Sequence, residues 1–347
     1  MDYDPLYLDL YESGELTKRR EALYAKLKNC DTCPRNCGAK RFQGPDQAMG
    51  FCRSSELARV AQAKPHFGEE PPLTGTRGAG TVFFSNCTGR CSFCQNYDIS
   101  QYGVGTDWTP EQLADAYLDL QERGCHNIDL VTPTHYVAPI VHALELAIPR
   151  GFRLPLVYNT NAYDSVETLR LLEGIISIYL PDVKYANDQI ALRYSAFGKL
   201  KRDEQSKPSH IEGGYWSAIQ RSIPEMYRQV GNFRVDDDGL GYQGVLVRHL
   251  IMPNGLSTTE DVLRFLASIS PNISISLMSQ YYPTNRASKR PELNRRISRS
   301  EYECALAAME RYGLDQGYVQ ELVEFGDEDD AYVPDWNDER WAMPEHI

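Results

Sequence analysis

Three cysteines within eight residues, Cys87, Cys91 and Cys94, have a spacing typical of a metal-binding loop. They follow the apolar residues 81–84, which predict a short buried strand. The thiolates can converge on one metal centre only if the backbone curls, and Gly89 inside the loop permits such a turn. Three sulfurs are one fewer than a closed zinc or four-iron site uses. Either a fourth protein ligand comes from elsewhere, or one metal position stays open.

Four more cysteines near the N-terminus have the spacing of a closed tetrathiolate site. They are Cys30, Cys33, Cys37 and Cys52. Zinc would make them a structural support for a region with little apolar sequence, whereas a second 4Fe–4S cluster would make them an electron relay or a substrate anchor. Thiolate spacing does not separate the two metals, so both stay open. The remaining cysteines, Cys125 and Cys304, are expected to be buried apolar side chains.

The set of Cys87, Cys91 and Cys94 resembles that of the radical S-adenosylmethionine (SAM) superfamily. The resemblance rests on the Cys-x3-Cys-x2-Cys spacing, on Phe93 before the last cysteine, and on the place of the loop after a first strand. Gln95, Asn96 and the motifs downstream are similar to the pyruvate formate-lyase activating-enzyme-like branch, in particular to its members with an extra N-terminal cysteine set. The resemblance covers about residues 30–320. It implies a 4Fe–4S cluster whose open iron is chelated by the amino and carboxylate groups of SAM.

Composition limits the other classes of function. A chain of 347 residues with 42% hydrophobic residues can bury a full core, and no run approaches the roughly 20 apolar residues of a membrane-spanning helix. The N-terminus lacks a secretory pattern, and seven of nine cysteines lie in two clusters, which favours metal binding in a reducing compartment. We therefore expect a cytoplasmic protein without a membrane partner. The net charge of −12 argues against nucleic acid as a partner.

From residue 81 onward the sequence alternates strands and helices. Strands are predicted at residues 81–84, 127–132, 154–160, 175–183, 244–252 and 273–278. Helices are predicted at residues 109–124, 137–147, 165–172, 219–230, 259–269 and 301–312. The first helix begins with a capping box of Thr109 and Gln112, and the last is expected to begin with Ser300 and Glu303.

Six such units predict an α/β fold with a mostly parallel sheet, a partial (β/α)6 TIM-like barrel that is open on one side, and the resemblance implies the same. Residues 1–74 are predicted to form an N-terminal helix and a small cysteine-rich metal-binding extension. Residues 75–320 form the barrel, with a polar insertion at residues 187–215, and residues 321–347 form an acidic tail. The two tryptophans of the tail indicate either that it covers the open side or that it is loosely held.

Polar residues follow the predicted strands, at the ends where parallel sheets bind ligands. The resemblance assigns cofactor contacts to Phe93, Thr132, Thr134, Asn159, Asn161, Asp182, Lys184, Arg248 and His249. The two threonines match the position that meets the SAM amino group, and the two asparagines match the ribose position. Phe93 would place its backbone beside the adenine.

Four of these residues could have a purely structural role instead of a role in cofactor binding. Arg248 is the candidate partner of the SAM carboxylate, or a structural arginine. Asp182 and Lys184 resemble an element that organises the cofactor and a nearby cation, or they form an ion pair on one face of a strand. His249 matches a histidine common in the branch, or it is a hydrogen-bonded core histidine.

The resemblance implies reductive cleavage of SAM to methionine and a 5′-deoxyadenosyl radical, which abstracts hydrogen from a substrate. That substrate is either a glycine of a glycyl-radical partner protein, as for the activases, or a small molecule. An electron donor such as flavodoxin or ferredoxin is implied as a partner. The alternative is a zinc-stapled binding protein without turnover, which requires a closed metal site at the central cysteines.

Overall fold

The structure is a computed structural model that describes residues 4–43, 50–202, 208–322, 334 and 336. Its centre is a ten-stranded sheet with the order β12-β11-β10-β6-β5-β4-β2-β1-β3, and β9 pairs with β10. The parallel strands are β2 (Ala79–Phe84), β4 (Ile128–Val131), β5 (Leu156–Thr160), β6 (Ile178–Pro181), β10 (Gly241–Leu250), β11 (Ser274–Met278) and β12 (Gly317–Val319). The antiparallel strands are β1 (Ala58–His66), β3 (Thr106–Trp108) and β9 (Arg234–Val235).

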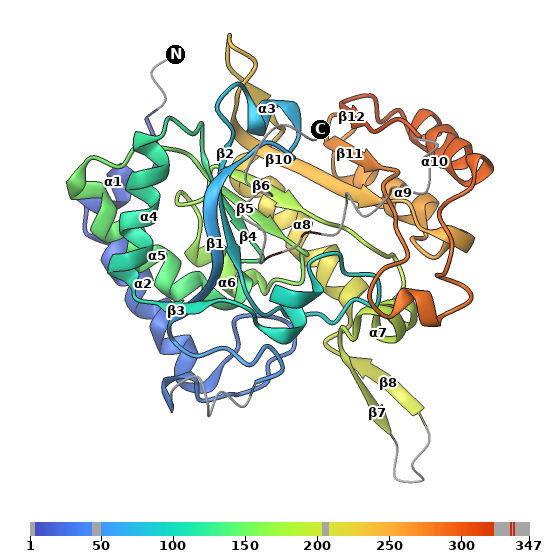
Figure 1. Cartoon of the computed structure of the whole chain (residues 1–347), viewed down its shortest axis with the longest axis horizontal. Coiled ribbons are helices and arrows are strands. Elements are labelled where there is room, and N and C mark those ends of the chain that lie inside the picture. The colour runs from blue at the N-terminus through green and yellow to red at the C-terminus, as the bar shows by residue number, and fades with distance from the viewer. Residues whose placement is uncertain (1–3, 44–49, 203–207, 323–333, 335, 337–347) are drawn as a thin grey trace.

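All six predicted strands are present, and the predicted α/β fold with a mostly parallel sheet is confirmed. The sheet curves, and helices cover its outer side (Figure 1). Among the described strands the order starts at β12 and stops at β3, so the sheet is a partial barrel and not a closed one.

The outer helices follow the strands that they cover. They are α4 (Pro110–Glu122), α5 (Val137–Ala147), α6 (Val166–Leu171), α8 (Tyr215–Val230), α9 (Thr259–Ile269) and α10 (Arg299–Arg311). The capping box of Thr109 and Gln112 is confirmed at the start of α4. The box predicted for the last helix is wrong by two residues, because Ser298 and Glu301 cap α10 instead. Arg295 also binds the Glu301 carboxylate at 2.7 Å, which favours the earlier box.

Strand β1 was not predicted, because its sequence contains Pro65 and several polar residues. It pairs antiparallel with β2, with Lys64 opposite Thr81. Residues 58–66 therefore lie in the main sheet, although the sequence assigned them to the N-terminal extension. Because β2 pairs with β1 on one side and with β4 on the other, the strand that leads into the Cys87 loop is an inner strand and not an edge.

The N-terminal arm is formed by α1 (Tyr7–Glu12) and α2 (Glu15–Lys26). Helix α2 packs on α5 and buries Leu16 and Leu23, as expected for a packing helix. The polar insertion contains α7 (Asp188–Ser195) and a hairpin of β7 (Lys199–Arg202) and β8 (Pro208–Glu212), which projects from the body (Figure 1). Within the described ranges no helix is long and apolar enough to cross a membrane.

Two apolar clusters hold the sheet in place. The larger one lies between the sheet and its helices, and it includes Cys125, as predicted. The smaller one lies on the inner face and contains Leu73, Val157, Ile178, Leu180 and Leu246. Leu73 comes from the short helix α3 (Pro71–Thr74), so α3 packs against this inner face. The prediction for Cys304 is wrong, because the outward side of α10 leaves this thiol exposed.

Candidate metal and cofactor site

The loop that contains Cys87, Cys91 and Cys94 begins where the fully buried strand β2 ends. Asn86 turns the chain with a φ of 66°, a conformation that asparagine tolerates better than most residues. Gly89 is not at a positive φ, so the sequence argument placed the turn at the wrong residue. A Cβ on Gly89 would lie 2.7 Å from the Phe197 ring, so glycine is required for close packing of the loop.

The three cysteines of this loop are half-buried and lie in one polar environment. Cys87 Sγ accepts hydrogen bonds from the Gly89 backbone N–H at 3.3 Å and from Asn161 Nδ2 at 3.4 Å. Cys94 Sγ lies 3.2 Å from Ser100 Oγ, in the π-helical turn Asp98–Tyr102. Burial and the neighbouring Cys94 and Cys87 sulfurs together raise the pKa of the Cys91 thiol to about 12, although the charge of Lys184 acts in the opposite direction. The fold therefore brings all three sulfurs together.

The donor set fits a cluster with one open corner. Among the described residues, the side chains that hydrogen-bond these sulfurs are two hydroxyls and an amide, from Ser100, Ser195 and Asn161, and the ammonium group of Lys184 acts on them through its charge. None of these groups is a usual fourth ligand of an iron–sulfur cluster. In the described ranges, no three Cys, His, Asp or Glu side chains are spaced around a single metal ion. A four-iron cluster is wider than one ion and holds its sulfurs farther apart.

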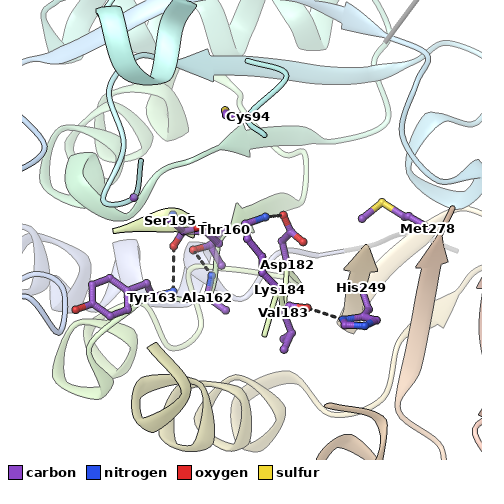
Figure 2. Close-up of polar contacts among 12 residues, drawn as sticks. Cys94, Thr160, Ala162, Tyr163, Asp182, Val183, Lys184, Ser195, His249 and Met278 are labelled. Atoms are coloured by element: carbon purple, nitrogen blue, oxygen red, sulfur yellow. Dashed lines mark hydrogen bonds and ion pairs between the residues drawn. The ribbon is translucent and has the colours of Figure 1, made fainter. Parts of the chain in front are cut away.

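Asp182 and Lys184 lie beside the thiols, directly after β6, and they pair with each other (Figure 2). Burial lowers the pKa of Lys184, but the charges of Asp182 and Cys91 outweigh burial and raise it. Asp182 Oδ1 is buried and has no hydrogen-bond partner among the described residues. The pair thus places a fixed positive charge next to the thiols and leaves one carboxylate oxygen available.

The end of β5 contributes Asn161, whose amide also donates to Thr88 Oγ1 at 3.0 Å. The neighbouring Thr134 is engaged elsewhere, in a buried network with Thr160 and Asp164. Burial raises the pKa of the Asp164 carboxyl, and the hydroxyls around it stabilise its charged form. Thr134 is 1% exposed, so the structure places it below the surface that a ligand would meet.

Two strand ends have a left-handed backbone at residues other than glycine. Thr132 after β4 has a φ of 62° and Ala162 after β5 has a φ of 61°. Such a conformation is unusual for a β-branched residue, and strain of this kind concentrates at functional sites. Thr132 stays at the strand-end position that the sequence predicted for it.

Arg248 and Asn159 are directed to a different set of partners. Arg248 pairs with Glu69 and Glu70, and its Nε lies 2.8 Å from a Glu70 oxygen. Asn159 Nδ2 donates to Asp129 Oδ2 at 3.3 Å. The predicted contact of Arg248 with the SAM carboxylate stays a prediction. For this contact, the guanidinium would have to bind the SAM carboxylate in place of, or in addition to, the carboxylates of Glu69 and Glu70.

His249 and Phe93 are buried in the protein interior. His249 Nδ1 lies 2.7 Å from the Val183 carbonyl and Nε2 lies 2.9 Å from Thr259 Oγ1 (Figure 2). Burial lowers the pKa of His249 to about 4, so the ring is neutral, as in the alternative interpretation of a core histidine. The Phe93 ring packs against Tyr281 with centroids 5.8 Å apart.

The N-terminal cysteines also lie close together. A hydrogen bond with Cys37 lowers the pKa of Cys30 to about 5, and burial together with the charge of Cys52 raises that of Cys33 to about 12. Arg41 lies beside them, is 1% exposed, and donates to the backbone carbonyls of residues 54 and 55. Its Nη1 is buried without a hydrogen-bond partner among the described residues.

The two cysteine loops pack against each other around Phe51. The Arg35 guanidinium lies 3.6 Å from the centroid of this ring, and the Arg90 guanidinium lies 4.9 Å from it. Arg35 also donates to the Thr88 carbonyl at 3.1 Å, and Arg90 donates to the Phe51 carbonyl at 3.0 Å. The N-terminal loop therefore rests directly on the loop of Cys87.

Sequence reasoning missed several charged residues that the structure buries or half-buries. Arg41, Glu70 and Asp129 are buried, and Arg35, Glu69 and Arg90 are half-buried. Asp129 carried a signal, since a carboxylate between Ile128 and Leu130 interrupts an apolar strand, and such a residue is buried only for a reason. The others carried none, because charged residues outside regular elements are most often exposed.

Comparison with known proteins extends these observations. The sequence model of the Radical SAM superfamily matches residues 81–204. MJ0674, an uncharacterized protein of Methanocaldococcus jannaschii, is 30% identical over 302 residues, which cover 84% of this chain and 77% of the relative.

Similar solved structures are more distant and contain more than this chain does. They include anSMEcpe with bound AdoMet (TM-score 0.43, 9% identity), which matches over 68% of this chain and 61% of its own. HydG, a maturase of the FeFe hydrogenase, matches over 67% of this chain and 49% of its own (TM-score 0.44, 12% identity). TsrM, a radical SAM methyltransferase of Kitasatospora setae, matches over 59% of this chain and 37% of its own (TM-score 0.40, 13% identity). This chain thus spans less than two thirds of each.

Proposed function

Because the chain belongs to the radical SAM superfamily, we propose that Cys87, Cys91 and Cys94 hold a 4Fe–4S cluster at which SAM is reductively cleaved. The cluster, once reduced, supplies the electron that converts SAM to methionine and a 5′-deoxyadenosyl radical, which takes a hydrogen atom from a substrate. The observation that carries the proposal is the convergence of three thiols with neighbours that leave a fourth position open.

The residues around the thiols would bind and orient SAM. Lys184 balances the negative charge of the thiolate-bound centre, and Asp182 fixes the position of its ammonium group. Asn161 is already in contact with Cys87, and its amide would reach ribose hydroxyls by exchanging its present bonds to Cys87, Thr88 and the Tyr163 N–H. Phe93 and the tyrosines around it form an apolar wall that excludes water from this side.

The test is turnover under anaerobic conditions. Purified protein is assayed for iron and sulfide, then supplied with dithionite and SAM, and 5′-deoxyadenosine is measured. About four irons per chain indicate one cluster and about eight indicate two. A protein that contains zinc alone and forms no 5′-deoxyadenosine contradicts the proposal.

We also propose a metal at Cys30, Cys33, Cys37 and Cys52. A tetrathiolate centre is negatively charged, and the buried guanidinium of Arg41, whose Nη1 has no hydrogen-bond partner among the described residues, supplies a matching positive charge. No three of these thiols, all of which the structure describes, are spaced around a single ion, so their spacing fits a wider cubane better than zinc. Metal analysis of a Cys30→Ser variant against the parent identifies the metal. Loss of one zinc with iron retained indicates zinc, whereas loss of about four irons indicates a second cluster.

Within the superfamily, we infer membership of the activating-enzyme-like branch from the Asp182 and Lys184 element. A glycyl-radical partner protein or a small molecule would be the substrate, and a flavodoxin- or ferredoxin-type protein would supply the electron. Replacing dithionite with reduced flavodoxin tests the donor. An unchanged yield of 5′-deoxyadenosine supports such a donor, and a yield near background contradicts it.

A further inference from the structure

A layer of carboxyl groups lies on the inner face of the sheet, next to the proposed cofactor site. Alternate residues of a strand share a face, so Arg248 lies on the same face as Leu246 of the inner apolar cluster. Arg248 also pairs across the sheet with Asp182, the partner of Lys184. A molecule bound in this layer would therefore lie close to the place where SAM is cleaved.

Three carboxyl groups face one guanidinium in this layer. Glu69 and Glu70 pair with Arg248, and Asp129 interacts with all three of them electrostatically. The charge of one arginine is thus already matched by the two glutamates, and Asp129 forms no ion pair among the described residues. Lys64 lies on the same face two strands away and is 7% exposed, but burial lowers its pKa and it forms no ion pair with a described residue. A basic side chain next to the layer, His66, does not change this balance, because burial lowers its pKa.

Asp129 is the independent sign of a ligand. It is 0% exposed, and its Oδ1 has no hydrogen-bond partner among the described residues. Only Oδ2 is engaged, by Asn159 at 3.3 Å. Burial strongly raises the pKa of this carboxyl and so favours its neutral form, whereas a cation bound beside it would favour the charged form.

Aromatic rings border the same layer. The His66 ring, which lies 3.7 Å from Glu69, packs edge-on against Phe83 with centroids 5.5 Å apart. Trp336 also packs edge-on against Phe83, with ring centroids 4.9 Å apart, and its buried Nε1 has no hydrogen-bond partner among the described residues. Carboxylates with aromatic rings beside them are the usual surroundings of bound ammonium and guanidinium groups.

We propose that this layer binds the substrate through a cationic group, an amine or a guanidinium, with Asp129 as its main partner. The inference rests on the proposed function, because it places the cation beside the site of radical formation. A divalent metal ion is the other ligand that carboxylates accept, and the test separates it.

The experiment measures binding to the full-length, cluster-loaded protein under anaerobic conditions at constant ionic strength. The probes are methylguanidinium and butylamine, with methylurea and butyrate as neutral and anionic analogues and Mg²⁺ and Ca²⁺ as metals. Binding is followed by calorimetry and by the shift in Tm. The variants are Asp129→Asn, which resembles the protonated carboxyl and should fold, and Asp261→Asn on the exposed face of α9 as a matched control.

We expect the organic cations to bind in the presence of SAM, and methylurea and butyrate not to bind. Asp129→Asn should weaken cation binding at least about tenfold, since a hydrogen bond to a charged group is lost, and Asp261→Asn should leave it unchanged. Equal binding of methylurea, equal binding by Asp129→Asn, or no cation binding overturns the inference. Binding of Mg²⁺ or Ca²⁺ alone, dependent on Asp129, assigns the layer to a metal and also overturns it.

Formation of 5′-deoxyadenosine from SAM and dithionite is measured in the same samples. It does not require the substrate cation, so we expect it in both variants. If 5′-deoxyadenosine forms and cations do not bind, only the further inference fails. If cations bind and 5′-deoxyadenosine is absent, the proposed function fails and the cation site stands by itself.

Discussion

Asp182 and Arg248 lie opposite each other on neighbouring strands, yet their surroundings give them different roles. Asp182 pairs with Lys184 next to the thiols and keeps one oxygen without a partner among the described residues. Arg248 is held by two carboxylates, and their charges raise its pKa against the opposing effect of burial. Position at a strand end therefore does not decide which side chain meets a ligand; the partners available in the interior do.

The thiols of the central loop should not be interchangeable with the other cysteines. Cys91→Ser removes one of three proposed cluster ligands and should lower 5′-deoxyadenosine formation at least about 100-fold. This loss is larger than the loss expected when a residue that only hydrogen-bonds a metal ligand is replaced. Iron content should fall with it. The matched control is Cys304→Ser, an exposed thiol on α10, for which both quantities should equal those of the parent. Full activity of Cys91→Ser would remove this residue from the site.

His249 should affect stability below neutral pH. Its pKa falls from 6.5 to about 4 on burial, so the unfolded chain binds a proton between these values and the folded protein does not. The stability that the folded protein gains from a neutral His249 is fully present above pH 6.5 and is lost as the pH falls towards 4. The free energy of unfolding should therefore drop by up to about 3 kcal/mol across this window.

A His249→Gln variant is the comparison. Glutamine keeps an amide for the Val183 carbonyl but does not titrate, so its unfolding free energy should vary less with pH than that of the parent. Urea unfolding at pH 4.5, 5.5 and 7 measures the difference. Parallel pH profiles for the two proteins would show that this ring is not the group that titrates.

At the scale of single elements, the start of α10 shows how contacts from outside a helix decide which serine is its N-cap. Ser298 and Ser300 are both good caps, and each is followed three residues later by a glutamate. The sequence alone does not distinguish them. The choice falls on Ser298 because Arg295 and the Asn254 backbone N–H hold Glu301 in place, and these contacts come from outside the helix.

A pair of serine variants tests this assignment. Ser298→Ala removes the side chain that accepts from the Glu301 backbone N–H and should reduce the free energy of unfolding by about 1 kcal/mol. Ser300→Ala should change it by less than about 0.5 kcal/mol, since this serine is exposed and caps nothing. Urea unfolding of both variants gives the two values. The reverse order of effects would restore the cap that the sequence predicted.

The parts of the fold that follow from periodicity were predictable from sequence, and those that depend on distant contacts were not. The six predicted strands and their helices have regular apolar patterns, so their predicted ranges are close to those observed. Strand β1 has no such pattern and is ordered by pairing with β2. At the site, the thiol spacing is a local signal, whereas the pairing of Arg248 with Glu69 joins residues 179 positions apart.

At the scale of the whole molecule, the N-terminal loop and the Cys87 loop share one contact. Arg35 donates to three backbone carbonyls, those of Thr88, Ala196 and Gly198, and lies over Phe51. These bonds tie the N-terminal loop to the cysteine loop and to the segment after α7. The arrangement is not covalent, so one substitution should loosen all three parts together.

Arg35→Ala should therefore increase amide hydrogen exchange in residues 30–38 and 87–94 at the same time. Three hydrogen bonds from a charged donor are lost, so the free energy of unfolding should fall by about 2–4 kcal/mol. Lys18→Ala on the exposed side of α2 is the control and should change neither quantity. If exchange rises in only one of the two loops, the contact does not couple them.

This shared contact has a consequence for how the protein ages in air. If the N-terminal cysteines hold the proposed metal, its oxidative loss would free Phe51, and the loop of Cys87 would lose the ring on which Arg35 and Arg90 stack. Loss of the N-terminal metal would then weaken the support of the proposed central cluster.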